Sequence, residues 1–379
     1  SIADPFLPKK IAEDRLEDIR ECIGCNICVS GDMTMSPIRC TQNPTMGEEW
    51  RKRWHPEIIQ RKGSSQSVLI VGGGPAGLEC ARALGRRGYQ VTLAEKKKEL
   101  GGRVTQESRL PGLAAWGRVR DYRIEQIRQM ENVEIYLDSD VTADDILEFG
   151  SEHIVLATGS CWRRDGVSRH HLSPQVFPES LVFTPDDIFS GRIPSGRVVV
   201  YDDDHFYLGG VLAEYCRKNG CEVTLITPAA VVSSWTVYTL EQETIQADLL
   251  KKGIKILPHH FVRPGQKTNP EAVHIYTESV PYEAKFLDCS ALVLVTARLP
   301  NSGLKSALEA VRNSWDEAGI KSVTRIGDAL APATIAAAVY SGHRYARELD
   351  EDIDPDAVPF ERELIEIAAE PDWETFWLE

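Results

Sequence analysis

Residues 68–79 read V-L-I-V-G-G-G-P-A-G-L-E, an apolar run that leads into three glycines spaced G-x-G-x-x-G. A run of this composition predicts a buried strand, and the residues after it predict a helix. In that context Gly72 permits a tight turn, Gly74 lets the backbone approach a pyrophosphate, and Gly77 lets helix and strand pack closely. The stretch therefore predicts an α/β dinucleotide-binding fold, with phosphate charge stabilised at the helix N-terminus.

Later signals in the chain are typical of an ADP-containing ligand. Glu95 ends the next predicted strand, where a carboxylate can hydrogen-bond both hydroxyls of an adenosine ribose. The lysines at 96–98 suggest a 2′-phosphate instead, although a solvated turn explains them better. G-G-R at 101–103, A-T-G at 157–159 and G-D at 327–328 complete the pattern. The predicted nucleotide-contacting residues are Gly72, Gly74, Pro75, Ala76, Gly77, Glu95, Lys96, Gly102, Arg103, Thr158, Gly159 and Asp328.

Apolar strand patterns alternate with helical patterns over most of the chain, which predicts parallel sheets covered by helices. We expect strands at 68–71, 90–95, 133–137, 153–157, 197–201, 222–226, 254–257, 273–278 and 291–296. We expect helices at 76–87, 114–130, 142–149, 207–219, 238–252 and 333–349. The predicted fold class is α/β: a loop-rich N-terminal segment followed by two Rossmann-like nucleotide-binding units of the flavin-disulfide-reductase type.

The second unit carries a damaged fingerprint. Its strand and turn read R-V-V-V-Y-D-D-D-H-F-Y-L-G-G, so Asp202, Asp204 and Tyr207 stand where glycines belong. Side chains there block the approach of a backbone to phosphate, and neighbouring carboxylates repel a pyrophosphate by on the order of 1 kcal/mol or more. We therefore expect no tight NAD(P)H binding. The unit is then a structural relic, or its acidic turn meets a cationic partner or substrate.

Four cysteines near the N-terminus are spaced C-x2-C-x2-C-x11-C, at Cys22, Cys25, Cys28 and Cys40. Three thiolates in one tight run can hold three corners of a cubane, and a fourth from a returning loop takes the last corner. A zinc site more often shows two separated C-x2-C pairs. The spacing therefore favours a [4Fe-4S] cluster. We interpret the other cysteines as core residues: Cys80, Cys161, Cys216, Cys221 and Cys289.

The composition excludes several classes of partner. The chain has 379 residues, a net charge of −14 and 42% hydrophobic residues, which is ordinary for a globular protein. The negative charge argues against nucleic acid and against an anionic membrane surface. Nine cysteines, four of them needed as thiolates, fit a reducing compartment, and we expect a cytoplasmic protein without membrane attachment.

Beyond these motifs, the chain resembles the C-terminal portion of the trimethylamine, dimethylamine and histamine dehydrogenase family. The N-methyl amino acid demethylases and 2,4-dienoyl-CoA reductase are relatives of that family. The resemblance rests on S-I-A-D-P-F-L-P-K-K, C-I-G-C-N-I-C, C-T-Q-N-P-T-x-G-E-E, W-H-P-E, L-P-G-L-x-x-W and I-G-D-A-x-A-P. It covers residues 1 to about 350, and its cysteine segment is its most specific part.

The resemblance implies an electron-transfer module. In the family, FMN on a preceding TIM barrel oxidises the substrate, and single electrons pass to the cluster and then to an electron-transferring flavoprotein. The first nucleotide unit holds ADP in the amine dehydrogenases, whereas in the reductase branch it holds FAD and the second unit takes NADPH. The glycines lost at 202–207 favour the amine-oxidising branch. A barrel takes about 250 residues, so we expect the FMN on a partner subunit or a missing domain, and the whole to be an oligomer.

Composition and motifs divide the chain into four parts. Residues 1–62 form the cluster segment, 63–190 with 297–350 the first nucleotide unit, 191–296 an inserted second unit, and 351–379 an acidic tail. The catalytic residues are unknown, because they belong to the barrel. The tail ends in aromatic residues, which predicts docking onto a neighbouring surface or a partly ordered terminus.

Two other functions remain as alternatives at this point. One is an FAD- and NADPH-dependent enzyme resembling 2,4-dienoyl-CoA reductase, and the other is a non-catalytic scaffold subunit. His170, His171, His259 and His260 lie in loop-like stretches without supporting carboxylate or cysteine spacing, so we expect surface histidines there instead of a metal site.

Overall fold

The computed structural model describes residues 2–49, 51, 54–62, 65–265 and 272–351. Apart from Glu351, the predicted acidic tail lies outside the described residues. Every strand and helix predicted from the sequence is present. The largest differences lie at the starts of two predicted helices. A 3₁₀ turn occupies Ala114–Gly117 before the helix Arg118–Arg128, and the helix predicted from residue 238 begins at Gln242.

The first unit contains a five-stranded parallel sheet in the order β15-β4-β1-β2-β3. These strands are β1 (Ser67–Val71), β2 (Gln90–Ala94), β3 (Val133–Tyr136), β4 (His153–Leu156) and β15 (Ser322–Arg325). The edge strand β15 was not predicted. Its sequence S-V-T-R is half-buried throughout, so it lacks the apolar run that marks its neighbours.

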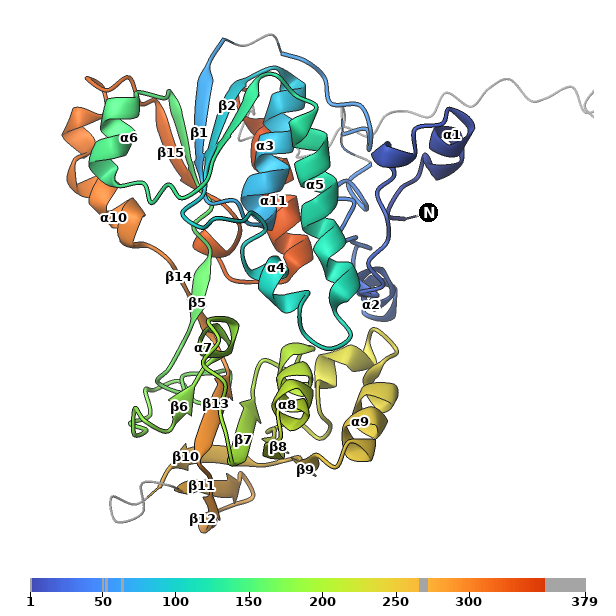
Figure 1. Cartoon of the computed structure of the whole chain (residues 1–379), viewed down its shortest axis with the longest axis vertical. Helices are drawn as coiled ribbons and strands as arrows, with labels where there is room; N and C mark the ends of the chain where they lie inside the picture. The colour runs from blue at the N-terminus through green and yellow to red at the C-terminus, as the bar shows by residue number, and fades with distance from the viewer. Residues whose placement is uncertain (1, 50, 52–53, 63–64, 266–271, 352–379) are drawn as a thin grey trace, which may run out of the picture.

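Helices cover both faces of this sheet (Figure 1). One face carries α3 (Pro75–Arg87), α5 (Arg118–Arg128) and α11 (Ile335–Glu348), and α6 (Ala143–Phe149) and α10 (Gly303–Ala310) cover the other. Because successive strand residues point to opposite faces, Val68 and Ile70 of β1 join the first core while Leu69 and Val71 join the second. Two-sided burial explains the continuous apolar run. The fold class predicted from the sequence is confirmed.

The second unit has its own parallel sheet, in the order β6-β13-β7-β8-β9. Helices α7 (Pro185–Phe189), α8 (Leu208–Lys218) and α9 (Gln242–Lys251) accompany it, and a three-stranded antiparallel sheet is inserted in the chain between its strands β9 and β13. The strands of the parallel sheet are β6 (Val182–Phe183), β7 (Arg197–Asp202), β8 (Glu222–Ile226), β9 (Lys255–Leu257) and β13 (Ala291–Val295). The antiparallel strands are β10 (Phe261–Pro264), β11 (Ala272–Thr277) and β12 (Val280–Asp288).

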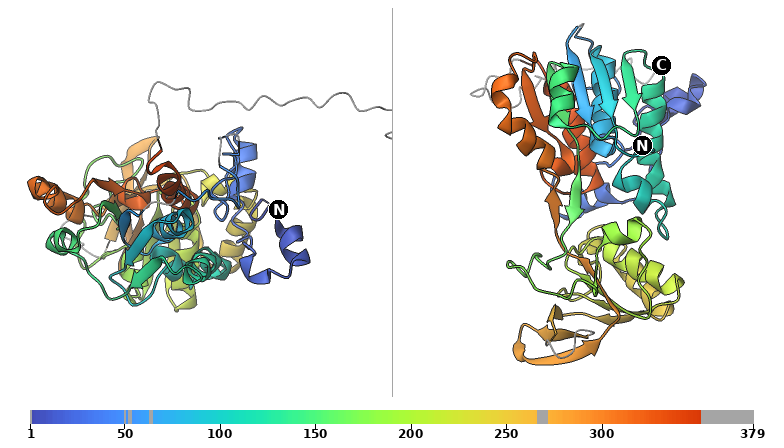
Figure 2. Two further views of the ribbon diagram at one scale, coloured as in Figure 1. Left: turned by 90° about the horizontal axis from the view of Figure 1, so that it is seen from above. Right: turned by 60° about the vertical axis from the view of Figure 1, so that its left-hand side comes forward.

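The second unit begins earlier than the predicted boundary at residue 191. Strand β6 pairs with β13, and α7 packs against both of these strands and against a two-stranded ribbon. That ribbon consists of β5 (Ser160–Trp162) paired antiparallel with β14 (Arg298–Pro300), and it joins the two units (Figures 1 and 2). The predicted boundary was wrong because two- and three-residue strands carry too little periodicity to be recognised.

The N-terminal segment contains two short helices, α1 (Leu7–Ala12) and α2 (Ile27–Met33), and otherwise consists mainly of loops. It lies against the first unit, where Gln126 of α5 donates a hydrogen bond to Asp18 over 2.9 Å. It also reaches the second unit: the Tyr207 hydroxyl donates to the backbone oxygen of Cys25 over 3.4 Å. The N-terminal segment therefore contacts both the first and the second unit (Figure 1).

A buried carboxylate connects these parts. Glu79 of α3 accepts hydrogen bonds from Arg82 (2.6 Å), from Arg123 of α5 (2.8 Å) and from His343 of α11 (2.8 Å). Arg123 also donates to the backbone and side-chain oxygens of Gln42, two residues after Cys40. Burial alone would raise the pKa of Glu79, but Arg82 and Arg123 hold it well below its usual value. One charge thus fastens three helices and the cysteine loop together.

Replacing Glu79 by Ala leaves two arginines buried without their carboxylate. We expect the free energy of unfolding of the first unit to fall by about 3–5 kcal/mol, measured by urea denaturation. Glu148→Ala, at an exposed position of α6, serves as the control and should change it by no more than about 0.5 kcal/mol. Equal stability of the two variants would contradict the anchoring role.

Candidate functional site

A cavity of about 870 Å³ lies between the two units and the N-terminal segment. Its size is in the range of ligand sites in proteins. All the residues predicted to contact a nucleotide line it, with the exception of Gly77. Residues from the other two parts complete its wall, including Ile23, Cys25, Tyr207 and Trp235. The sequence pattern therefore located one wall of the cavity, and the fold supplies the opposite wall.

The glycine turn has the geometry that its motif requires. Gly72 has a φ of +111°, and a Cβ there would lie 2.4 Å from the backbone oxygen of Ala157. A Cβ on Gly77 would lie 1.9 Å from the oxygen of Gly72, so Gly77 acts in helix–strand packing and not in the cavity wall. A Cβ on Gly74 would meet nothing within 4 Å. Gly74 therefore leaves open space beside the start of α3.

Glu95 is fixed beside this turn. The side chain is 6% exposed, and its two oxygens accept hydrogen bonds from the backbone N–H groups of Gly73 (2.7 Å) and Lys97 (2.8 Å). A carboxylate oxygen can accept more than one hydrogen bond, so both retain capacity for ligand hydroxyls. The structure thus holds Glu95 in the cavity wall in one orientation.

Arg103 and Asp328 lie at the ribbon end of the cavity. Arg103 donates to Ser160, and Asp328 accepts from the Ser160 hydroxyl (2.8 Å) and from Arg298 (2.6 Å). The Nη1 atom of Arg103 is buried without a hydrogen-bond partner, although Asp328 lies 3.9 Å away. An anionic ligand would satisfy this donor. Arg298 was not predicted, because the motifs do not include the ribbon strand β14.

Glu107 is a further cavity residue that the sequence did not indicate. It ends α4 (Arg103–Glu107), and burial raises the pKa of its carboxyl group to about 7, against the opposing effect of Arg103 and Arg298. The group therefore changes its protonation state near neutral pH. Only the three-dimensional structure reveals this burial, since an isolated glutamate in a short helix is otherwise ordinary.

The four motif cysteines are free thiols in the N-terminal segment. Burial raises the pKa of Cys25, with a hydrogen bond from Thr41 opposing it, and burial likewise raises the pKa of Cys40. Cys25 is influenced by the charges of Cys22 and Cys40, and Cys40 by that of Cys28, so all four are near neighbours.

The spacing of the sulfur atoms bears on the group they would hold. No three of the four lie within 4.8 Å of one another. One tetrahedral zinc ion with bonds of about 2.3 Å needs sulfurs roughly 3.8 Å apart. A cluster spreads its four thiolates over four iron atoms. The donor set and its spacing therefore fit a [4Fe-4S] cluster better than zinc.

The damaged turn of the second unit is filled by its own carboxylate. Asp202 ends β7, and its Oδ1 accepts from the backbone N–H groups of Asp204 (3.2 Å) and His205 (3.0 Å). A Cβ on Gly209 would lie 2.4 Å from the Asp202 carboxyl carbon, so α8 begins directly against this group. Burial and the neighbouring Asp204 raise the pKa of Asp202 to about 7. The position that a phosphate occupies in an intact turn is therefore taken.

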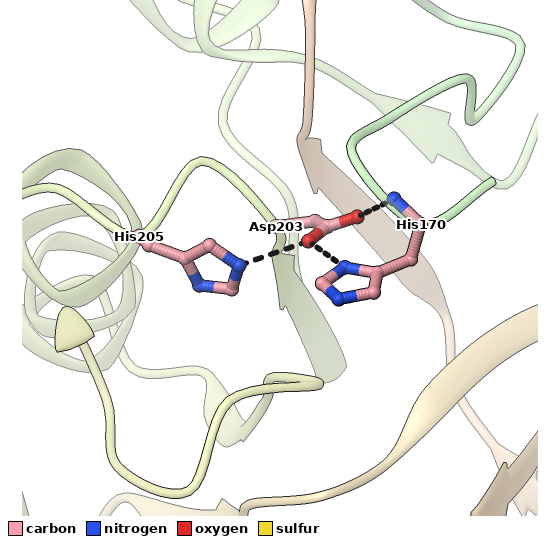
Figure 3. Close-up of side chains that lie close together, drawn as sticks. All are labelled: His170, Asp203 and His205. Carbon is pink, nitrogen blue, oxygen red and sulfur yellow. Dashed lines mark hydrogen bonds and ion pairs between the residues drawn. The ribbon is translucent and has the colours of Figure 1, made fainter. Parts of the chain in front are cut away.

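Asp203, the next residue, lies among histidines (Figure 3). Its Oδ1 atom accepts a hydrogen bond from Nδ1 of His170 over 2.7 Å, and Nε2 of His205 lies 3.0 Å from the same oxygen. Burial would raise the pKa of Asp203, but hydrogen bonds from His205, Ser168 and His170 lower it to about 2. The sequence predicted a surface histidine at 170. Its side chain is 43% exposed, but its ring points toward Asp203.

Comparison with known proteins identifies the family. Residues 66–342 match the family described as pyridine nucleotide-disulphide oxidoreductase. The chain belongs to this family.

Relatives with recorded activities are similar over nearly the whole chain. Dimethylamine dehydrogenase of Hyphomicrobium sp. (strain x) is 38% identical over 96% of this chain and 52% of its own length. The structure of histamine dehydrogenase from Rhizobium sp. 4-9 matches with a TM-score of 0.92 and 53% identity, covering 97% of this chain and 57% of that chain. The structure of a 6-hydroxypseudooxynicotine amine oxidase from Pseudomonas geniculata N1 matches with a TM-score of 0.87 and 43% identity. The match covers 93% of this chain and 52% of that chain.

These comparisons confirm the resemblance to dimethylamine and histamine dehydrogenases. The chain spans about half the length of the relatives it matches. This member of the oxidoreductase family therefore corresponds to part of those proteins. Among the described residues, no helix is long and apolar enough to cross a membrane.

The buried carboxyl of Glu107 predicts a pH effect on stability. Its pKa is raised from 4.5 to about 7 on folding, so between these values the folded protein holds a proton that the unfolded chain has lost. Stability from this group is fully present below about pH 4.5 and is lost as the pH rises to about 7, by roughly 3 kcal/mol at most. As the pH rises from about 5.5 to about 8, the melting temperature of Glu107→Gln should increase relative to that of wild type. The control Glu131→Gln, at an exposed position, should show no such relative increase in melting temperature. A difference in melting temperature between Glu107→Gln and wild type that does not change with pH would contradict the assignment.

Proposed function

We propose that this chain is the electron-transfer portion of an FMN- and [4Fe-4S]-containing amine dehydrogenase or N-demethylase. The chain receives single electrons from FMN on a TIM-barrel domain or partner subunit and delivers them to an electron-transferring flavoprotein. The donor is an amine with a CH–NH or N-methyl group. Support comes from the similarity to dimethylamine and histamine dehydrogenases over more than nine-tenths of the chain.

The observation that carries the proposal is the position of Cys25. It belongs to the cysteine motif and also lines the cavity that contains the nucleotide-motif residues. Cys22, Cys25, Cys28 and Cys40 would hold the cluster, which when bound supplies one-electron oxidation and reduction. Tyr207 and Thr41 position this loop, through hydrogen bonds to the Cys25 backbone oxygen and sulfur.

The nucleotide in our proposal is ADP, with FAD as the alternative. Gly72, Gly74 and the first turn of α3 would face the phosphates, and Glu95 the ribose hydroxyls. Arg103 offers a buried N–H donor, Nη1, that has no hydrogen-bond partner, at the far end of the same wall. An ADP bound here would join the strand ends of the first sheet without taking part in redox chemistry.

The turn of the second unit argues against an NADPH-dependent reductase. Asp202 accepts the two backbone N–H groups that would otherwise bind phosphate, and Asp204 adds a second carboxylate at the cavity wall. Displacing Asp202 would leave its carboxylate buried without these bonds, which costs about 1–3 kcal/mol or more. The second unit therefore acts as a wall of the cavity and as support for the cysteine loop.

The N-terminal segment offers a surface for the FMN-bearing part. Its exposed apolar side chains include Ile11, Leu16 and Met33, which are 49–57% exposed, and Met35, which is 99% exposed. These exposed apolar side chains are available for burial against another protein surface. The nine cysteines form no disulfide among the described residues, and we propose a reducing, cytoplasmic setting for the protein.

Cys25→Ala tests the relay. In the enzyme purified together with its FMN-bearing part, we expect the iron content to fall and acceptor reduction to stop, while the amine still reduces FMN under single-turnover conditions. Stopped-flow absorbance separates the two steps. Cys161→Ala, at an exposed cysteine outside the motif, should transfer electrons as wild type does. Unchanged acceptor reduction by Cys25→Ala would refute the proposal.

Denaturing the purified protein and separating the released nucleotide chromatographically tests the cavity. We expect ADP without flavin, and at least tenfold less of it from Gly74→Val. Gly74 has φ −74° and ψ −177°, which any residue adopts, so the variant should keep its circular dichroism spectrum. Release of FAD would make a reductase-like function the leading one. Full nucleotide content in Gly74→Val would contradict the assigned phosphate position.

A further inference from the structure

We infer that His170, Asp203 and His205 form a binding site for a divalent transition-metal ion of the zinc type, separate from the cysteine motif. The three side chains come from a loop between β5 and β6, from the end of β7 and from the turn before α8. One ligand atom from each lies within 4.8 Å of the other two. This is the only such group of His, Cys, Asp and Glu side chains among the residues that the structure describes.

The distances are close to those of a loaded site. His170 Nδ1 and His205 Nε2 lie 2.7 Å and 3.0 Å from the same oxygen, Asp203 Oδ1. Zinc with bonds of about 2.0–2.2 Å to nitrogen and oxygen needs donors roughly 3.4 Å apart. An ion would therefore enter after the two nitrogen–oxygen contacts widen by about 0.4–0.7 Å, replacing the protons that now join the imidazoles to the carboxylate.

The surroundings hold the carboxylate and one imidazole in place. Asp203 is fully buried, and its other oxygen, Oδ2, accepts a hydrogen bond from the backbone N–H of His170 over 3.1 Å. The ring of Phe261 packs edge-on against the ring of His170, with centroids 5.4 Å apart. Such supporting contacts orient metal ligands and fix the direction of their donor atoms.

The site also has an entry route and an open position. The His170 side chain is 43% exposed, whereas that of His205 is 13% exposed, so an ion would enter from the His170 side. Two nitrogens and one carboxylate oxygen leave a fourth position for water. Imidazole and carboxylate donors together favour zinc and similar divalent ions over the softer Cu(I), and over calcium and magnesium, which prefer oxygen alone.

The position gives the ion a role in the second unit. It joins three segments at the carboxyl end of β7, the edge where an intact Rossmann unit binds its dinucleotide. The neighbouring residues Asp204 and Phe206 line the cavity. A bound ion would therefore fix the turn that forms one wall of the cavity.

Calorimetric titration of tag-free, cluster-loaded protein with Zn²⁺ tests this site. We expect one equivalent to bind in wild type, and the dissociation constant to rise at least tenfold in His170→Gln, whose exposed position should leave the fold intact. His274→Gln is the matched control: it removes an imidazole from β11 that contacts Phe286 and lies outside the group. Equal affinity for Zn²⁺ in wild type and His170→Gln would overturn the inference. An equal loss of Zn²⁺ affinity in His274→Gln and His170→Gln would do so as well.

X-ray absorption at the zinc edge distinguishes this site from the cysteines. The expected spectrum contains only nitrogen and oxygen neighbours at about 2.0–2.2 Å. Sulfur neighbours at about 2.3 Å would mean that the zinc occupies the cysteine motif, and this would overturn the inference. Failure of wild type to bind zinc would do the same.

Discussion

The structure depends on one buried negative charge. Glu79 lies in the helix that follows the glycine turn, and it is fully buried with Arg82, Arg123 and His343. A carboxylate inside a protein is tolerated only when cations and hydrogen-bond donors surround it, so the helices supplying them must take one arrangement. Because Arg123 also binds Gln42, the position of the cysteine loop follows from the packing of the nucleotide-binding unit.

The sequence predicts those features that are fixed by local constraints. Gly72 and Gly77 cannot carry a Cβ without contacting backbone atoms, so this turn between strand and helix requires glycine at both positions. Continuous apolar runs such as that of β13 predict strands covered on both faces, and all five of its residues are buried. The spacing of the cysteines likewise places three thiols within seven consecutive residues, with Cys22 and Cys25 in a loop and Cys28 in the first turn of α2. In each case the physical requirement acts over a few consecutive residues.

Features made by distant segments could not be predicted in this way. Arg298 of the ribbon strand β14 donates a hydrogen bond to Asp328, 30 residues later in the chain, and the group around Asp203 joins residues 33 positions apart. The pKa of Glu107 is raised by burial that no local pattern encodes. Strand β6 has two residues and exists because β13 offers it an edge, so tertiary packing and not propensity defines the start of the second unit.

The carboxylate of Asp202 changes what the second unit responds to. A turn filled by a nucleotide is stabilised by mass action, so its stability follows the concentration of free ligand. We propose that the turn of the second unit, filled by its own Asp202 side chain, gains no such stability from nicotinamide nucleotides. It responds to protons instead, because the raised pKa of Asp202 makes its folded form retain a proton that the unfolded chain releases. The stability of this turn therefore depends on pH through the carboxyl group of Asp202.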